Sequence, residues 1–223
     1  MRYVFQFGVV AESIDVLFWG AVATLRLSLL AMLGGLAIAI VCAYLRTSGP
    51  SPVRWAVAVY VEVIRNTPFL VQLFVIYFSL PAIGIRFDAD HAAVLGMSIN
   101  FGGYATEILR AGIESIPRGQ IEAGRALGLK PLRIFRHIVL FPAVKTIYPA
   151  LASQFVILLL ASSVVSAISA TELTAVTNTL QSRTFRSFEF YFVATALYLA
   201  MALLVRSGLT SLYWLIFMRG RIA

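Results

Sequence analysis

The sequence is poor in the charged residues that soluble domains carry. Only 13% of its 223 residues are charged, whereas a soluble domain has about 25%. Apolar residues make up 60% of the chain and gather into long uninterrupted runs, which indicate membrane-spanning helices. Strands of a β-barrel would instead alternate in segments of about ten residues. We therefore predict an all-α membrane protein with a single transmembrane domain over residues 1–223.

Residues that catalysis and metal binding require are also scarce. The single cysteine, Cys42, excludes an intramolecular disulfide and a thiolate metal cluster. The two histidines, His91 and His137, are far apart and lack metal-ligand spacing. Neither Lys130 nor Lys145 follows a glycine, so the chain has no phosphate loop for ATP. We expect no enzyme activity and no cofactor bound by this chain.

The net charge of +8 does not indicate nucleic-acid binding. The basic residues sit at the ends of apolar runs and form no contiguous basic face, as expected for a protein whose surroundings are a lipid bilayer. No cleavable signal peptide is evident, because the first apolar run is too long for one. We interpret that run as a retained span.

The apolar runs predict five spans joined by short polar segments. The predicted spans cover about 14–45, 55–80, 92–113, 146–168 and 188–217. The longest polar interval, about 114–143, separates the third span from the fourth. From Arg110 to Lys145 it contains seven Lys or Arg and two acids, which predicts a cytoplasmic location. The distribution of basic residues then places the N-terminus outside and the C-terminus in the cytoplasm.

Two features of the spans bear on packing. Ala31, Gly35, Ala39 and Ala43 recur every four residues, which predicts a helix face that another helix approaches closely. The alternative is ordinary alanine-rich composition. Pro68 interrupts the second span and frees backbone polar groups at membrane depth. Such a break is tolerated only where protein or a water-filled cavity satisfies those groups.

Polar side chains inside spans mark either a transport pathway or a contact between helices. The candidates for a substrate pathway are Asn66, Thr67, Pro68, Gln72, Asn100, Gln154, Ser162 and Ser163. The N–H groups of a broken helix can hold a substrate carboxylate near the bilayer midplane. The alternative is that these side chains only tie helices together. Glu107 and Arg110, at i,i+3 spacing, are interpreted as an ion pair at the inner interface.

Inside the polar interval, residues 117–128 predict a short rigid helix. Pro117 suits its first turn, and Gly128 suits its end. Glu122 and Arg125 are predicted to form an i,i+3 pair on its exposed face.

Four segments in this order resemble the permease subunits of ATP-binding cassette (ABC) importers, in the branch that takes up polar amino acids. They are Arg65–Gln72, Gly102–Arg110, Glu122-Ala-Gly with Gly128 and Ile138, and Ser182–Glu189. The resemblance covers nearly the whole chain. It implies a type I importer fold of about five transmembrane helices and a short cytoplasmic coupling helix. The residues that it implies for coupling to an ATPase are Arg118, Ile121, Glu122, Ala123, Gly124, Arg125, Leu127 and Gly128.

The resemblance also implies partners and a location. The partners are two ATPase subunits that carry ATP and Mg, a second permease subunit (a paralogue or a second copy) and an extracytoplasmic solute-binding protein. The location is the bacterial cytoplasmic (inner) membrane, with several passes. The implied substrates are polar amino acids or related zwitterions such as opines. The alternative is an ion-coupled secondary transporter or channel, which would leave the basic interval and its rigid helix unexplained.

Two departures from the family pattern stand out. Phe141 precedes Pro142, where the family usually has Leu-Pro. Leu160 and Ala161 occupy positions where members that move basic or polar amino acids often carry Lys-Asp. We expect from the second departure that this subunit supplies a less charged half of the pathway and that a paralogous permease supplies the rest.

Overall fold

The computed structural model describes residues 3–218, and this part of the chain is helical with no strand. Most of its elements are α-helices, with short 3₁₀ and π segments where spans begin, end or bend. The elements are α1 (Phe7–Ala11), α2 (Ile14–Ser48), α3 (Ser51–Arg65), α4 (Phe69–Phe74), η1 (Val75–Ser79), η2 (Leu80–Ile83), α5 (Ala89–Glu114), α6 (Arg118–Ala126), α7 (Pro131–Arg133), η3 (Ile134–Leu140), α8 (Phe141–Ala161), η4 (Ser162–Ile168), α9 (Leu173–Thr184) and α10 (Ser187–Phe217).

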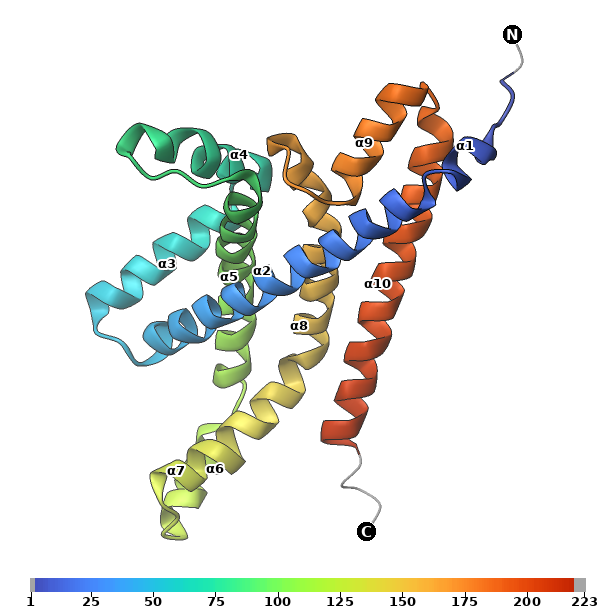
Figure 1. Ribbon diagram of the computed structural model, residues 1–223. Coiled ribbons are helices and arrows are strands. Elements are labelled where there is room, and N and C mark those ends of the chain that lie inside the picture. Colours follow the sequence, from blue (N-terminus) through green and yellow to red (C-terminus); the bar gives the residue numbers. More distant parts are fainter. Residues whose placement is uncertain (1–2, 219–223) are drawn as a thin grey trace.

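Helix α5 is the centre of the bundle, and α2, α3, α4 and α8 pack on it (Figure 1). One close approach is at Gly35 of α2. A Cβ atom there would lie 2.6 Å from the ring of Phe101 and 2.8 Å from the carbonyl oxygen of Ser98. The four small residues that recur along α2 are all buried, namely Ala31, Gly35, Ala39 and Ala43. The predicted small-residue face is therefore confirmed.

The predicted interruption of the second span is a sharp bend. Helix α3 and the helical run from Phe69 to Ile83 meet at 110°, and Pro68 caps the second of them. The pair projects to one side of α5 (Figure 1). The predicted span of 55–80 is thus a broken span or a re-entrant loop rather than one straight helix.

Among the described residues, three helical stretches are long and apolar enough to cross a membrane: Ile14–Ser48, Pro131–Ile168 and Ser187–Phe217. The bent pair raises this number to as many as four. Helix α5 contains the predicted span 92–113 but falls outside this set. Its neighbours screen it from the surroundings, so it needs fewer apolar residues. The predicted count of five spans stays a prediction.

The polar interval is more helical than expected. After α6, the chain becomes helical again at Pro131 and continues through α7, η3 and α8 to Ile168, so the helix of the fourth span begins well before 146. Proline at the first turn favours this early start, because its fixed φ suits a helix there. The π-helical η3 ends just before Pro142, whose missing N–H interrupts the α-helical pattern.

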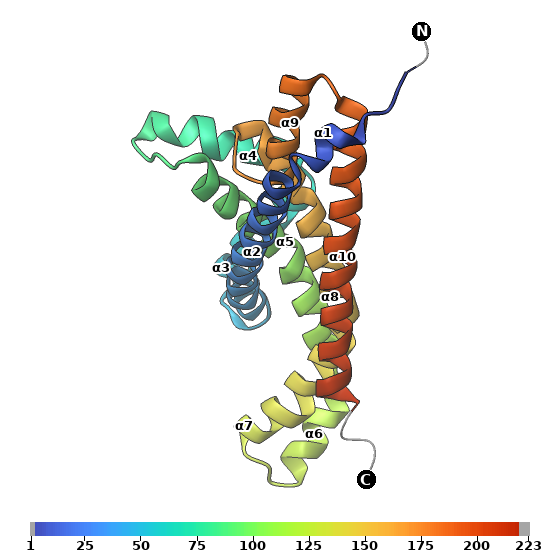
Figure 2. The ribbon, with the colours of Figure 1, turned by 45° about the vertical axis from the view of Figure 1, so that its right-hand side comes forward.

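The two ends of the bundle differ. Helices α1 and α9 lie at one end, and α6 and α7 lie at the other, toward which the last residues of α10 also point (Figures 1 and 2). Residues 169–187, predicted to be polar and partly helical, contain α9.

Candidate coupling and translocation sites

Helix α6 stands outside the bundle at one end (Figure 2). Pro117 caps its start, and Gly128, at φ +70°, follows its end. The N–H of Gly128 donates to the carbonyl of Arg125 at 2.9 Å, and the N–H of Leu129 donates to that of Gly124 at 3.1 Å. These two bonds make a Schellman closure, which requires the left-handed conformation that glycine adopts without strain. The predicted helix and both of its boundaries are confirmed.

Gly124 is the contact point between α6 and the helical run that leads into α8. It is buried, and a Cβ atom at this position would lie 2.7 Å from Cδ1 of Ile138 and 3.3 Å from Cγ1 of Ile134. Gly119 on the same helix has nothing within 4 Å of such an atom. A glycine at position 124 therefore lets α6 lie directly on its neighbour.

The remaining residues predicted for coupling mostly face outward. Arg118, Glu122, Ala123, Arg125, Leu127 and Gly128 are exposed, and Ile121 is half-buried. The predicted ion pair between Glu122 and Arg125 is wrong, because no salt bridge of the described residues joins them. Two charges in water gain little by pairing. Both charged groups thus remain open to other contacts.

The side chain of Gln72 bridges the helix break. Its Nε2 group donates to the carbonyl of Ile64 at 2.9 Å and to both oxygens of Thr67. Its Oε1 atom accepts from Nδ2 of Asn100 at 2.9 Å. Gln72 thereby satisfies carbonyls near the break at Pro68 and fastens the break to α5. In this conformation the two amides tie helices together, which is the alternative that the sequence left open.

Three other candidates do not join this network. Asn66 is exposed and donates to the carbonyl and carboxylate of Glu62, one turn back in α3. The hydroxyls of Ser162 and Ser163 donate to carbonyls three residues back, at 2.6 and 2.8 Å. Their polar atoms are therefore occupied within their own helices.

Gln154 lines a different cavity, of about 510 Å³, between α5 and α8. Arg65, Tyr104, Glu107 and Arg110 also line it. The guanidinium of Arg65 lies 5.9 Å from the ring centre of Tyr104, and Arg110 Nη2 lies 2.7 Å from Glu107 Oε2, which confirms the predicted ion pair. The cavity brings together cationic, anionic and amide groups, a combination suited to a small zwitterion. Nothing local in the sequence predicts that Arg65 and Tyr104 lie beside Gln154.

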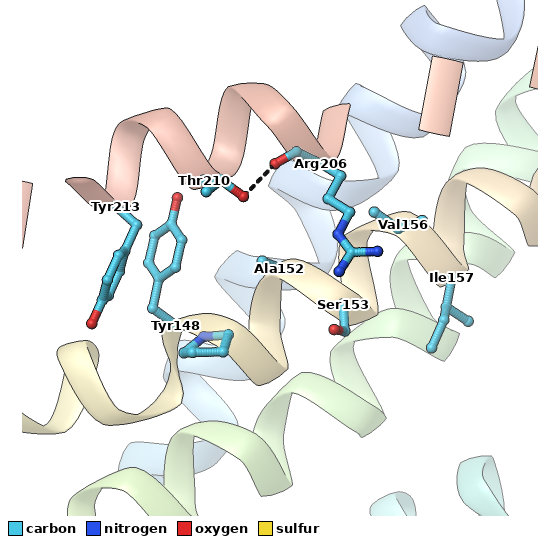
Figure 3. A pocket seen from close by; sticks show the side chains of 9 residues that line it. Tyr148, Ala152, Ser153, Val156, Ile157, Arg206, Thr210 and Tyr213 are labelled. Atoms are coloured by element: carbon cyan, nitrogen blue, oxygen red, sulfur yellow. Dashed lines mark hydrogen bonds between the residues drawn. The ribbon is translucent and has the colours of Figure 1, made fainter. Parts of the chain in front are cut away.

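A second cavity of about 500 Å³ lies between α8 and α10. Figure 3 shows the Arg206 side chain extending from α10 toward Ser153 of α8, with Tyr148 and Tyr213 further along the groove. The hydroxyl of Thr210 donates to the carbonyl of Arg206. An arginine within an apolar run is a signal of function, and Arg206 was not among the predicted pathway residues.

Two buried carboxylates were also missed. Glu172 is fully buried at the start of α9 and accepts from the N–H groups of Thr174 and Ala175 and from the hydroxyl of Tyr198. Burial raises the pKa of Glu172. Glu189 is fully buried at the start of α10. An acid just before a helix is a recognisable cap, but nothing local in the sequence reveals its burial.

A membrane bundle with a broken helix, a polar cavity between its central helices and a closed helix outside the bundle defines the membrane-embedded subunit of a transporter. The sequence profile of the family described as "Binding-protein-dependent transport system inner membrane component" matches residues 35–216. The chain belongs to this family. It is a multi-pass membrane protein and a permease subunit of an ABC importer, and nothing supports an ion-coupled carrier or channel.

Named relatives agree with this family. The glutamine transport system permease protein GlnP of Escherichia coli (strain K12) is 34% identical over 90% of this chain and 93% of its own length. The L-cystine transport system permease protein TcyB of Bacillus subtilis (strain 168) is 38% identical over 69% of this chain and 66% of its own length. A crystal structure of an amino acid ABC transporter with histidines matches with a TM-score of 0.87 at 34% identity, over 95% of this chain and 99% of that one.

Proposed function

We propose that this permease forms part of a pathway for polar amino acids and that α6 couples the pathway to a separate ATPase subunit. The observation that carries the coupling role is the geometry of α6. The helix is closed at both ends, lies on the α8 run through Gly124 and turns its charged residues outward. A force applied to such a helix passes into a span without first unwinding a loop.

The substrate class rests on two observations. Several relatives bear names of amino-acid permeases, and the Gln154 cavity offers Arg65 for a carboxylate and the amide oxygen of Gln154 for an ammonium group. Leu160 is partly exposed and Ala161 half-buried, and neither brings a charge to α8. We keep the proposal that a paralogous second permease supplies the more charged half of the pathway.

The proposed assembly contains two permease subunits, two ATPase subunits that hold ATP and Mg, and an extracytoplasmic solute-binding protein. In it α6 faces the cytoplasm, so the end of the bundle with α1 and α9 faces outward. The N-terminus is then outside and the C-terminus inside, in agreement with the many basic residues near α6. ATP-driven closure of the ATPases shifts the permease between inward-open and outward-open states.

The coupling role is tested by a matched pair of glycine substitutions in α6. Gly124→Val places atoms where Ile138 already lies, whereas Gly119→Val points into open space. Overpacking costs about 1–3 kcal/mol and displaces α6, so Gly124→Val should weaken ATPase binding and uptake by about tenfold or more. Gly119→Val has a similar effect on helix propensity without the clash. It should retain most of the uptake.

Both variants are measured in the purified complex reconstituted in proteoliposomes, with uptake, ATP hydrolysis and the ATPase retained on purification as readouts. Charge reversal in Glu122→Lys is a third variant, expected to lower uptake per ATP hydrolysed while membrane insertion stays normal. Normal coupled uptake in both Gly124→Val and Glu122→Lys would refute the role of α6.

A further inference from the structure

Five aromatic rings form a continuous exposed cluster where the N-terminal segment meets the start of α10. We name this cluster the aromatic corner, and its members are Tyr3, Phe5, Phe7, Phe188 and Phe192. The ring centres of Phe5 and Phe188 are 5.1 Å apart, those of Tyr3 and Phe5 5.3 Å, and those of Phe7 and Phe192 6.2 Å. Each side chain is between 43% and 60% exposed. The rings therefore contact one another but are not covered by the rest of the chain.

Beneath these rings, Glu189 holds the N-terminal segment in place. Its buried carboxylate accepts from the hydroxyl of Tyr3 and, at 2.9 Å, from the backbone N–H of Gln6. Arg186 lies 4.0 Å from the same carboxylate and donates to the carbonyl of Val4 at 3.3 Å. Residues 3–6 precede α1 and have no helical hydrogen bonds, so these contacts fix their path. Arg186 and Glu189 belong to Ser182–Glu189, one of the four segments that resemble the amino-acid branch of the family. Neither the coupling site nor the pathway site includes this segment.

The aromatic corner continues an exposed apolar stripe on α10, of the kind that contacts lipid. Phe188, Phe192, Leu199 and Leu203 recur at helical spacing and are all more than half exposed, so they form one stripe. This stripe runs along a helix that is long and apolar enough to span a membrane. Aromatic residues take the place of leucine at the start of this stripe, and the exposed Trp214 does so again near the other end of α10. Such a change from aliphatic to aromatic side chains is characteristic of the membrane–water interface.

The backbone of residues 3–6 indicates how deep in the bilayer the aromatic corner lies. Lipid-exposed irregular backbone does not occur in the hydrocarbon region, because its polar groups find no partner there. At the level of the headgroups, water satisfies them while the rings remain in contact with acyl chains. We propose that the aromatic corner is an interfacial anchor, seated in the headgroup region of the leaflet at the α9 end and locked to α10 by Glu189.

The anchor goes beyond the proposed transport function, and it does not depend on the substrate or on α6. Its test is a depth measurement with spin labels in the complete complex, reconstituted in bilayers. Replacing the only cysteine, by Cys42→Ala, gives a background for single labels. One label is placed by Phe5→Cys in the corner. Leu203→Cys, on the same stripe, serves as the deep control, and Arg86→Cys, in the exposed segment before α5, serves as the aqueous control.

Collisions with oxygen report contact with hydrocarbon, and collisions with a water-soluble nickel chelate report contact with water. We expect the label at position 5 to have nickel accessibility between those of the two controls, with substantial oxygen accessibility. A nickel accessibility equal to that at position 86 would overturn the anchor in favour of a water-exposed surface. Low accessibility to both reagents would overturn it in favour of a surface covered by protein.

The role of Glu189 in holding the N-terminal segment against α10 is tested separately with Glu189→Ala. Loss of the acceptor should make the label at position 5 more mobile and raise its nickel accessibility toward that at position 86. The label at position 203 should be unchanged in the same variant, which shows that α10 is still inserted. An unchanged label at position 5 would remove Glu189 from the proposal.

Discussion

The two ends of the bundle use glutamate in opposite ways. At the α6 end, Glu122 is exposed and lacks a salt bridge within the described residues. At the α9 end, Glu172 and Glu189 are fully buried, and each accepts hydrogen bonds from several donors. An exposed charge contributes little to folding and stays open to a partner. A buried carboxyl group whose oxygens accept hydrogen bonds instead fixes neighbouring segments in one arrangement, because its desolvation requires all of those contacts.

The largest effect on stability is expected from Glu189→Ala. This change removes the acceptor of Tyr3 and Gln6 and leaves Arg186 without its carboxylate. Loss of one partner of a buried charged network is strongly destabilising, so the unfolding temperature of the purified permease should fall by roughly 5 °C or more.

Glu122→Ala is the matched control at the other end. As a surface change it should shift the unfolding temperature by only about 1 °C. Equal shifts for the two variants would contradict the division between the two ends. Both are measured by thermal unfolding in the same detergent.

Glu172→Ala should have an intermediate effect. Glu172 caps α9 through the N–H groups of Thr174 and Ala175 and also accepts from Tyr198. Loss of a helix cap costs about 1 kcal/mol, which corresponds to a decrease of about 3 °C in the unfolding temperature of a chain of this size. Glu172→Gln keeps one acceptor oxygen and should lose less. A larger loss for glutamine than for alanine would rule out the capping explanation.

The pH dependence at Glu172 supplies an independent check. Because burial raises the pKa of this carboxyl, the folded protein binds the proton more tightly than the unfolded chain. The stability that Glu172 contributes through this proton is therefore fully present below the ordinary pKa of glutamate. It is lost as the pH rises through the raised pKa of the folded state. Glu172→Gln should remove this slope from the unfolding temperature. An unchanged slope would assign the pH dependence to other groups.

Local patterns in the sequence predicted those parts of the fold that local geometry determines. The helix between Pro117 and Gly128 depends on its own caps, and the close packing at Gly35 depends on a four-residue repeat. The break at Pro68 was predictable for the same reason, because proline removes a helical hydrogen bond. Its angle of 110° was not, since that angle depends on how α4 packs against α5.

The features of the fold and of the candidate sites that were not predicted depend on contacts between residues far apart in the sequence. Tyr3 meets Glu189 across 186 positions, and Gln72 meets Asn100 across 28. Neither pair leaves a periodic signal. Gln72 and Asn100 were predicted as polar candidates without being paired, and the contact of Tyr3 with Glu189 was not predicted at all. Gln154 was a candidate in its own right, but its cavity neighbours Arg65 and Tyr104 come from other elements. The predicted pair of Glu122 and Arg125 had suitable spacing, but exposure to water removed the reason to form it.

The smallest effect is expected in the charged network of Arg110, Glu107 and Glu114 at the α6 end of α5, where the two carboxylates differ in burial. Arg110 lies 2.7 Å from Glu107 and 2.5 Å from Glu114, and the Glu114 side chain is 55% exposed against 21% for Glu107. An exposed ion pair contributes about 0–1 kcal/mol, so Glu114→Gln should lower the unfolding temperature by only about 1 °C. Glu107→Gln should cost more, because its carboxylate makes three contacts with Arg110 and is less screened. Raising the salt concentration should reduce the effect of Glu114→Gln further, because salt screens exposed charges. The effect of Glu107→Gln should change less and remain the larger of the two. If Glu114→Gln proved the more damaging, burial would no longer explain why charges near α6 contribute so little, and the contrast between the two ends would need a cause other than exposure to water.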